Sequence, residues 1–336
     1  MSRSTGSRIV VQLNAYSPYR LWSLGETVPE RIARAFPTVR VVQSHDREAF
    51  LRLLPEAVVL YTWSLPRRHF ARARNLRWVH TPETGAELLL FPELVKSDVL
   101  VTNSGAVSAE AAADHAWGLL LMLSRRLAIC IEAQRSRLWA RDRLWSGDVV
   151  PFSLEDRTIV IVGLGAIGRA VARRAKASGM SVIGVRRHQR NDVPDGVDEV
   201  HTHEALAEVL PRAEAIAACL PLTPATRRVF GAACFARCKP GCLFVNVGRG
   251  ELVDDDALIE ALESGRLGGA GLDVFSNEPL ARDHPLWSHP RVVLTPHVAG
   301  TDPRYMERVT ELFERNLARF IEGQPLLDVI DKKAGY

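Results

Sequence analysis

The sequence is poor in lysine and in long apolar runs. Five of its 43 basic residues are lysine, they form no dense basic block with the arginines, and the formal net charge is +4 over 336 residues. This pattern argues against nucleic-acid binding. The most apolar stretch, residues 111–123, contains Asp114 and His115 and is too short for a transmembrane helix. Because residues 1–13 also lack a signal-peptide pattern, we expect a cytoplasmic protein that binds no membrane.

Cysteine is scarce as well. Three of the five cysteines, Cys234, Cys238 and Cys242, are spaced four residues apart, which is a spacing that metal ligands on a helix could show. Pro240 and Gly241 would end any helix before the third cysteine, and no other ligand residues cluster beside it. We therefore predict no metal site, and three small buried residues near the end of a helix.

The sequence does contain a predicted strand, a glycine-rich turn and a predicted helix in immediate succession. Residues 158–162 are apolar or β-branched, Gly163-Leu-Gly165-Ala-Ile-Gly168 follows, and a helical pattern continues from Arg169. In this setting G-x-G-x-x-G is typical of dinucleotide binding, with the pyrophosphate at the N-terminus of the helix. The predicted cofactor contacts are Gly163, Gly165, Ala166, Ile167 and Gly168. The alternative is a glycine turn that binds no nucleotide.

The next predicted strand, residues 181–185, ends in Arg186 and Arg187 instead of a carboxylate. In NAD-binding domains an acidic residue about 20 positions after the glycines binds the ribose hydroxyls. A guanidinium can instead bind a 2′-phosphate through two charge-assisted hydrogen bonds. We therefore predict NADP as the cofactor, with NAD possible. The alternative is a solvated arginine cluster on a loop.

Predicted strands and helices alternate along the whole chain, which favours an α/β protein with parallel sheets. The predicted strands of the first part are residues 9–13, 39–42, 57–61, 76–81 and 99–103. We expect a helix at residues 87–95, one long helix at 106–126, and an irregular connector at 139–151. The first hundred residues are expected to form a flavodoxin-like domain of their own.

Three loops after later predicted strands carry groups suited to hydride chemistry. They contain Arg249, then Asp273 and Glu278, and then His297. Reduction of a carbonyl needs a cofactor, a proton donor and a cation that orients the substrate. Open α/β sheets bind their ligands at the carboxyl ends of strands, where these loops are predicted to lie.

In this order, and with the glycine turn upstream, these motifs resemble the D-isomer-specific 2-hydroxyacid dehydrogenase family, most closely its glyoxylate/hydroxypyruvate reductase branch. The resemblance covers nearly the whole chain. It includes Ala113-Asp-His, Leu220-Pro-Leu-Thr, Lys239-Pro-Gly and Pro285-Leu-Trp. The resemblance implies that His297 is the acid/base group, that Glu278 orients its imidazole, and that Arg249 binds the substrate carboxylate and polarises the carbonyl.

The resemblance also implies further ligand contacts. Asp273 matches a carboxylate near the nicotinamide, and Thr223 lies in a loop on the adenosine side of the cofactor. The remaining expected cofactor contacts are Leu220, Pro221, Thr226, Val247 and Gly248. The expected substrate contacts besides Arg249 are Thr84, Gly85, Ala86 and Trp63, although Trp63 suits a core position equally well.

Two features of the sequence bear on this resemblance. The segment before Gly85 departs from the family pattern, because Pro82 lacks an N–H and Glu83 adds a negative charge, so we expect Glu83 to face solvent. His115 is expected to be a structural histidine in the long helix.

The implied architecture is two Rossmann/flavodoxin-like domains with parallel sheets. The NAD(P)-binding domain, residues 106–297, is inserted into a substrate-binding domain made of residues 1–105 and 298–336. The implied function is NADPH-dependent reduction of a small 2-oxo acid such as glyoxylate or hydroxypyruvate to the D-2-hydroxy acid, by a homodimer. Two alternatives stay open: another substrate of the phosphoglycerate, branched or aromatic type, and a dinucleotide-sensing regulator without turnover.

Overall fold

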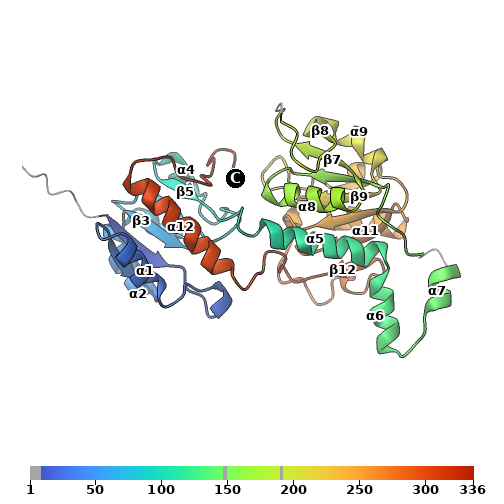
Figure 1. The fold of residues 1–336 in the computed structure, drawn as a ribbon, viewed down its shortest axis with the longest axis horizontal. Helices are drawn as coiled ribbons and strands as arrows, with labels where there is room; N and C mark the ends of the chain where they lie inside the picture. The colour runs from blue at the N-terminus through green and yellow to red at the C-terminus, as the bar shows by residue number, and fades with distance from the viewer. Residues whose placement is uncertain (1–8, 147–149, 190–191) are drawn as a thin grey trace, which may run out of the picture. The chain divides into compact units, whose positions relative to one another are not determined.

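The protein is described here by a computed structural model that covers residues 9–146, 150–189 and 192–336 (Figure 1). The chain divides into two compact units, Met1–Ser108 with Asp302–Tyr336, and Ala109–Thr301. The second unit is thus one continuous stretch inserted into the first. Each unit has its own parallel sheet, which confirms the predicted fold class. No helix in the described ranges is long and apolar enough to cross a membrane.

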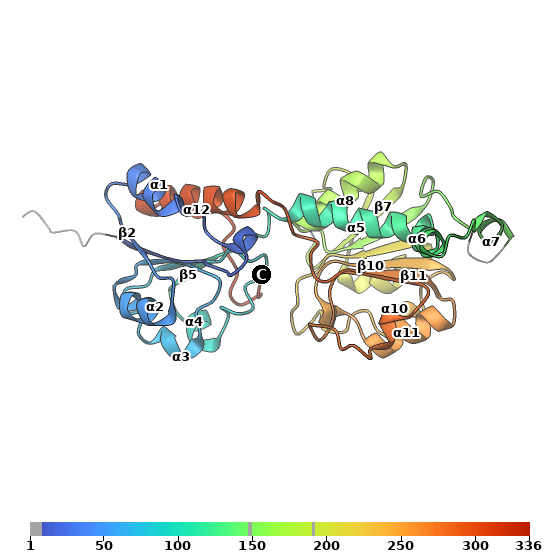
Figure 2. The same cartoon turned by 90° about the horizontal axis from the view of Figure 1, so that it is seen from below.

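The first unit contains a five-stranded sheet in the order β2-β1-β3-β4-β5, with every pair of neighbours parallel. This is the strand order of flavodoxin-like folds. The strands are β1 (Val10–Asn14), β2 (Arg40–Gln43), β3 (Val59–Thr62), β4 (Trp78–His80) and β5 (Leu100–Thr102). Figure 2 shows two helices, α1 (Val28–Ala35) and α12 (Tyr305–Ile321), on one face of this sheet. The opposite face carries α2 (Arg47–Leu53), α3 (Arg67–Phe70) and α4 (Pro92–Lys96).

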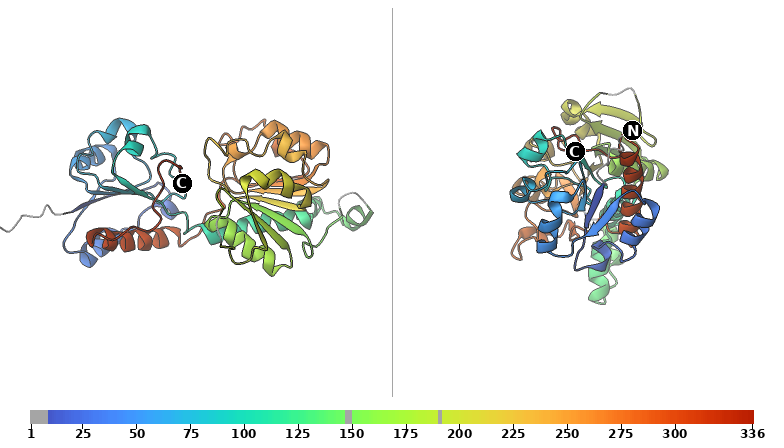
Figure 3. Two further views of the ribbon diagram at one scale, coloured as in Figure 1. Left: turned by 90° about the horizontal axis from the view of Figure 1, so that it is seen from above. Right: turned by 90° about the vertical axis from the view of Figure 1, so that its left-hand side faces the viewer.

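The C-terminal helix α12 completes the core of the first unit, and Figure 3 (left) shows it in red along the sheet. Its residues Tyr305, Val309, Phe313 and Leu317 recur every fourth position, so they lie on one face of the helix, and all are buried. The ring of Phe313 stacks on those of Tyr61 and Trp78, with centroids 4.6 and 5.1 Å apart. Helix α12 is therefore an integral part of the first core although it begins at Tyr305, far along the chain from the end of β5 at Thr102.

A fully buried histidine, His80 at the end of β4, bonds the Thr102 hydroxyl through Nδ1 at 2.8 Å and the Ser104 hydroxyl through Nε2 at 3.3 Å. Burial lowers its pKa to about 3, from the 6.5 of an exposed histidine. The unfolded chain therefore binds a proton between these two values that the folded chain does not. The contribution of neutral His80 is fully present above pH 6.5 and is lost as the pH falls toward 3.

We expect this histidine to make the protein acid-sensitive. Compared with His80→Gln, the wild type should lose about 1.4 kcal/mol of unfolding free energy for each pH unit below 6.5. Urea unfolding of both proteins at several pH values between 4.5 and 6.5 would measure the difference. Parallel pH profiles for the two proteins would show that His80 is protonated, or freely solvated, in the folded state.

The second unit contains a seven-stranded parallel sheet in the order β12-β11-β10-β9-β6-β7-β8. Read from β8, this is the Rossmann order with a seventh strand added. The strands are β6 (Thr158–Val162), β7 (Ser181–Arg186), β8 (Glu199–Thr202), β9 (Ala215–Ala218), β10 (Cys242–Asn246), β11 (Leu267–Leu272) and β12 (Val292–Leu294). Helices α5 (Ala109–Ser124) and α8 (Ala166–Ala177) share one buried cluster with the sheet. Helices α9 (Leu206–Val209), α10 (Ala232–Phe235) and α11 (Asp255–Glu263) share the cluster on the other face.

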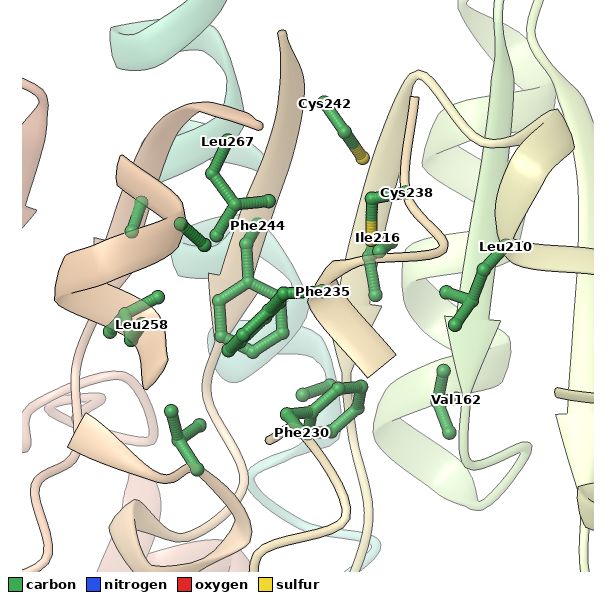
Figure 4. Close-up of a cluster of buried hydrophobic side chains, with 14 of the residues drawn as sticks. Val162, Leu210, Ile216, Phe230, Phe235, Cys238, Cys242, Phe244, Leu258 and Leu267 are labelled. Carbon is green, nitrogen blue, oxygen red and sulfur yellow. The ribbon is translucent and has the colours of Figure 1, made fainter. Parts of the chain in front are cut away.

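Aromatic rings and two cysteines fill part of this second cluster (Figure 4). The ring of Phe244 meets those of Phe230 and Phe235 edge-on, at centroid distances of 5.0 and 5.5 Å. Cys238 and Cys242 are buried beside these rings, beyond the end of α10, as predicted, and both thiols are free. Cys234 is half-buried.

Several predicted elements differ from the structure. The long helix expected at 106–126 ends at Ser124, because Arg126 adopts a left-handed conformation with φ 54°, and α6 (Leu127–Arg135) begins after it. The connector expected at 139–151 contains α7 (Arg141–Ser146), and its residues 147–149 lie outside the described part. The helix expected at 87–95 is reduced to α4, with Pro92 in its first turn. The edge strand β8, which contains His201, is not among the elements predicted from the sequence. The remaining short elements are the 3₁₀ turns Arg20–Trp22, Leu54–Glu56, His203–Ala205, Leu210–Arg212, Gly250–Leu252 and Pro285–Trp287.

Candidate active site

The glycine turn joins β6 to α8 at the point where the order of the second sheet reverses. Gly163 has φ 106°, and a Cβ there would lie 2.5 Å from the carbonyl oxygen of Cys219. A Cβ on Gly168 would overlap the carbonyl of Gly163, so these two positions require glycine. Gly165, in contrast, faces open space immediately before Ala166, the first residue of α8. Exposed backbone at the N-terminus of a twelve-residue helix fits the pyrophosphate of a dinucleotide.

The loop after β9 lies against this turn, and the loop after β10 lies against the loop after β9. A Cβ on Gly248 would come within 2.9 Å of the Leu220 carbonyl oxygen, so the two loops are in direct contact. Farther along the first loop, Thr223 and Thr226 bond each other through their hydroxyls at 3.0 Å, and Thr226 donates to the Pro221 carbonyl at 2.7 Å. Both threonines therefore shape the loop, and a role in contacting the cofactor stays a prediction.

The arginine at the end of β7 has a partner that the sequence did not reveal. Arg186 donates from Nη1 to the Asp192 carboxylate at 3.1 Å and from Nη2 to the Asp192 carbonyl at 2.9 Å. Arg169, in the first turns of α8, approaches the same carboxylate at 3.9 Å. Arg187 is exposed. The end of β7 therefore carries charges of both signs, because the Asp192 carboxylate lies among several guanidinium groups.

Two of the three predicted catalytic loops touch through a glycine. Arg249 follows β10, and its carbonyl accepts a hydrogen bond at 2.9 Å from the buried Asn246, whose side chain also accepts one from Gly248 N–H at 3.0 Å. A Cβ on Gly250 would overlap the backbone of Phe275. Only glycine therefore lets the loop that carries Arg249 lie directly against the loop that carries Glu278.

Glu278 and His297 form the central contact of the site. The imidazole Nδ1 lies 2.6 Å from Glu278 Oε2, and Oε1 accepts the Phe275 N–H at 2.9 Å. Because a carboxylate accepts hydrogen bonds, Nδ1 donates, and the tautomer is fixed. Nε2 makes no hydrogen bond with any described residue, and about half of the His297 side chain is exposed. Nε2 is thus the ring nitrogen that can take up or give a proton while Nδ1 stays bonded to Glu278.

The loop that carries His297 is held in place from β11. His297 adopts a left-handed backbone with φ 53°, and its N–H donates to the Asp273 carbonyl at 2.8 Å. The Asp273 carboxylate is buried and accepts the N–H groups of Val298 at 2.9 Å and Ala299 at 2.8 Å. Asp273, predicted only as a neighbour of the nicotinamide, therefore anchors the loop next to the proposed proton donor.

This anchor is extended by two side chains, Thr295 just after β12 and His115 on α5. The Thr295 hydroxyl donates to Asp273 Oδ1 at 2.6 Å, and His115 Nε2 lies 2.8 Å from the same hydroxyl. The sequence predicted only a structural role for His115, and it gave no role to Thr295. The motifs Ala113-Asp-His and Thr295-Pro-His contain both residues, but the pairing is visible only once the two segments are folded together.

In the first unit, the backbone carbonyls just before Gly85 accept hydrogen bonds, whereas the neighbouring backbone N–H groups donate none to the described residues. The carbonyl of Pro82 accepts the Tyr305 hydroxyl, that of Glu83 accepts Ser104 N–H, and that of Thr84 accepts the Asn103 amide. Within the described residues, no acceptor faces the backbone N–H groups of Thr84, Gly85 or Ala86. Three successive backbone N–H groups that no described residue accepts are a donor set of the kind that binds anions.

Trp63, the other predicted substrate contact, lies half-buried at the core of the first unit. Its ring is 6.3 Å from that of Trp22, edge-on. Its Nε1 is buried and has no acceptor among the described residues. A buried indole N–H usually finds a partner, so Trp63 is both a core residue and an unused donor. No group of three or more His, Cys, Asp or Glu side chains that could hold a metal ion occurs in the ranges that the structure describes.

Comparison with known proteins gives one consistent result. Residues 117–299 match the family described as "D-isomer specific 2-hydroxyacid dehydrogenase, NAD binding domain". The chain is 34% identical over 267 residues to a glyoxylate reductase of Thermococcus gammatolerans, covering 79% of each chain. It is 35% identical over 274 residues to a glyoxylate reductase of Korarchaeum cryptofilum, covering 80% of each.

Solved structures of similar proteins match the fold of this chain over almost its full length. An NADPH-dependent glyoxylate/hydroxypyruvate reductase from Sinorhizobium meliloti, in complex with NADP and sulfate, superimposes with a TM-score of 0.81 at 29% identity, covering 98% of this chain and 100% of that one. A D-isomer specific 2-hydroxyacid dehydrogenase from Xanthobacter autotrophicus, in complex with NADPH and MES, gives 0.81 at 30% identity with the same coverage.

Proposed function

The chain belongs to the D-isomer-specific 2-hydroxyacid dehydrogenase family, and from that premise we propose that it reduces a small 2-oxo acid to the D-2-hydroxy acid with NADPH. Glyoxylate and hydroxypyruvate are the proposed substrate type, because relatives over four fifths or more of the chain bear those names. The observation that carries the proposal is the 2.6 Å contact between Glu278 and His297, next to the loop of Arg249. The homodimer implied by the sequence stays a prediction.

Each residue of this site has a separate part in the proposed reaction. A bound nicotinamide supplies the hydride to the carbonyl carbon. His297 gives the proton on Nε2 to the carbonyl oxygen, and Glu278 holds the imidazole through Nδ1 and stabilises its charged form. Arg249 offers a planar fork of donors to the substrate carboxylate and draws charge toward the carbonyl oxygen. The N–H groups of Thr84, Gly85 and Ala86 in the first unit stay predicted substrate contacts.

Asp273 holds the loop that carries His297, and this leads to a prediction at Thr295. Thr295→Val removes the hydroxyl that joins His115 to Asp273, so kcat should fall about tenfold or more, as for loss of a hydrogen bond to a charged group. Thr295→Ser keeps the hydroxyl and should keep most of the activity. If the valine and serine variants are equally active, the anchor has no part in positioning His297.

For the cofactor, we propose that Arg186 and Arg187 bind the 2′-phosphate of NADPH, and that the phosphate replaces Asp192 as the partner of Arg186. Replacing both arginines by alanine should raise the Michaelis constant for NADPH about tenfold or more, because hydrogen bonds to a charged group are lost, and should leave that for NADH nearly unchanged. The constants would be measured from initial rates at saturating 2-oxo acid. Equal changes for both cofactors would contradict the assignment.

The proposed function is tested by turnover itself. Oxidation of NADPH and of NADH would be followed with a panel of glyoxylate, hydroxypyruvate, 3-phosphohydroxypyruvate, a branched and an aromatic 2-oxo acid. We expect glyoxylate or hydroxypyruvate with NADPH to give the highest kcat/KM. A higher value for one of the larger acids would move the substrate assignment to that acid. No turnover with any member, in protein that still binds NADPH, would leave a dinucleotide-sensing protein as the better description.

A further inference from the structure

The second unit contains a cavity at the end of its sheet where the strands begin. The cavity measures about 200 Å³, against roughly 30 Å³ for one water in the liquid. It is lined by the end of α5, the first turn of α6, the turns at Gly241 and Gly265, the first residues of β11, and residues 290–293 leading into β12. Figures 1 and 2 show where α5 passes into α6. Because all these strands begin here, the cavity is distinct from the catalytic loops, which follow their carboxyl ends.

Two guanidinium groups line the cavity, and none of the described residues that line it is acidic. Arg126 donates from Nη1 to the Gly268 carbonyl at 3.1 Å, and Arg291 from Nη1 to the Leu262 carbonyl at 2.8 Å. Each of these carbonyls is neutral, so the two positive charges lack a compensating anion within the lining. The Arg126 Nε is buried and has no acceptor among the described residues.

The backbone adds to the positive character of the cavity. Arg126 is the N-cap of the nine-residue helix α6, and Ala128 in its first turn lines the cavity. Ile129 and Cys130 donate to the Arg126 carbonyl, whereas the N–H groups of Leu127 and Ala128 find no acceptor in the described part of the chain. These free N–H groups, at the positive end of the helix dipole, favour an anion.

Both the backbone and the charge of Arg126 are in unfavourable surroundings. Its left-handed backbone, with φ 54°, is unusual for a residue with a long side chain. Burial lowers the pKa of its guanidinium, and the charge of Arg291 lowers it further. An anion between the two arginines would reverse this second effect and partly offset the first.

We propose that this cavity binds a small oxyanion carrying two negative charges, of the inorganic phosphate or short dicarboxylate type, between Arg126 and Arg291. Two guanidinium groups in one lining match an ion with several oxygens better than chloride, because a guanidinium offers parallel donors to two oxygens. The apolar lining from Leu123 and Val292 limits the ligand to a compact one. The proposal does not depend on the reaction that the catalytic loops perform.

The test is a calorimetric titration of the full-length protein with inorganic phosphate and, separately, with succinate, at constant ionic strength set with sodium chloride. Saturating NADP⁺ keeps phosphate out of the dinucleotide site. We expect one saturable site for phosphate, for succinate or for both, and Arg126→Met and Arg291→Met should each weaken it about tenfold or more. Arg237→Met, at an exposed arginine on another element, is the matched control and should bind as the wild type does.

The variants also separate this cavity from the catalytic site. Arg249→Gln should leave the titration unchanged if the ion binds in the cavity. If Arg126→Met fails to fold, Arg291→Met decides alone, because Arg291 is an exposed residue. Absence of saturable binding for both ions would overturn the proposal. So would binding that survives both arginine substitutions, or binding that only Arg249→Gln abolishes.

Discussion

Replacing His297 with glutamine is expected to lower kcat for 2-oxo acid reduction by roughly 10²–10⁴-fold, the range that general acid–base catalysis supplies. Glutamine can keep a hydrogen bond to Glu278, but it has no proton to give to a developing alkoxide at neutral pH. Because His297 lies outside the glycine turn and the loops beside it, the affinity for NADPH should change little. Initial rates at saturating NADPH and varied glyoxylate would separate kcat from KM.

A matched control for this variant is His203→Gln, which changes an exposed histidine in a 3₁₀ turn before α9. The control should retain the wild-type kcat. Full activity in His297→Gln would mean that another group delivers the proton. A large rise in KM with an unchanged kcat would instead make His297 a substrate-binding residue.

Replacing Arg249 with glutamine should give the second large effect, a fall in kcat/KM of roughly 30- to 5000-fold. That range corresponds to the loss of about 2–5 kcal/mol when one partner of a buried, hydrogen-bonded charge pair is removed. Arg249→Lys keeps the charge but not the planar fork, so its kcat/KM should lie between those of the glutamine variant and the wild type. The comparison therefore separates charge from geometry.

Arg237→Gln serves as the control for Arg249, because Arg237 is an exposed arginine outside the catalytic loops. Its kcat/KM should equal that of the wild type. The role given to Arg249 would be wrong if the glutamine variant lost activity only through weaker NADPH binding, or if it lost none. Far-ultraviolet circular dichroism would confirm that each variant is folded.

The parts of the structure that sequence reasoning predicted depend on local patterns. The alternation of strands and helices, and the glycine turn at Gly163, are properties of short windows of sequence. The convergence of Arg249, Glu278 and His297 also follows from such windows, because parallel strands bring their carboxyl ends to one edge of the sheet. The parallel sheets are confirmed, and the family membership is established by the comparisons. The roles of individual residues stay predictions.

What sequence reasoning missed depends on contacts between distant segments. The edge strand β8 is short and half-exposed, so its alternation is weak, and only pairing with β7 defines it. The break at Arg126 occurs inside a continuous run of helix-forming residues, and there the Arg126 side chain bonds the Gly268 carbonyl in the distant strand β11. Asp192 lies six residues beyond Arg186, and the residues beside it in the sequence form no pattern that predicts the ion pair.

The insertion of one unit into the other has a consequence for the order in which the chain is made. Residues 109–301 leave the ribosome as one uninterrupted stretch, so the second sheet can close while synthesis continues. The first sheet emerges earlier but waits for the last segment, because until α12 follows, Tyr61 and Trp78 lack the ring of Phe313. We therefore expect the first unit to finish folding after the second, and a chain stopped before Tyr305 to expose the aromatic face that α12 covers.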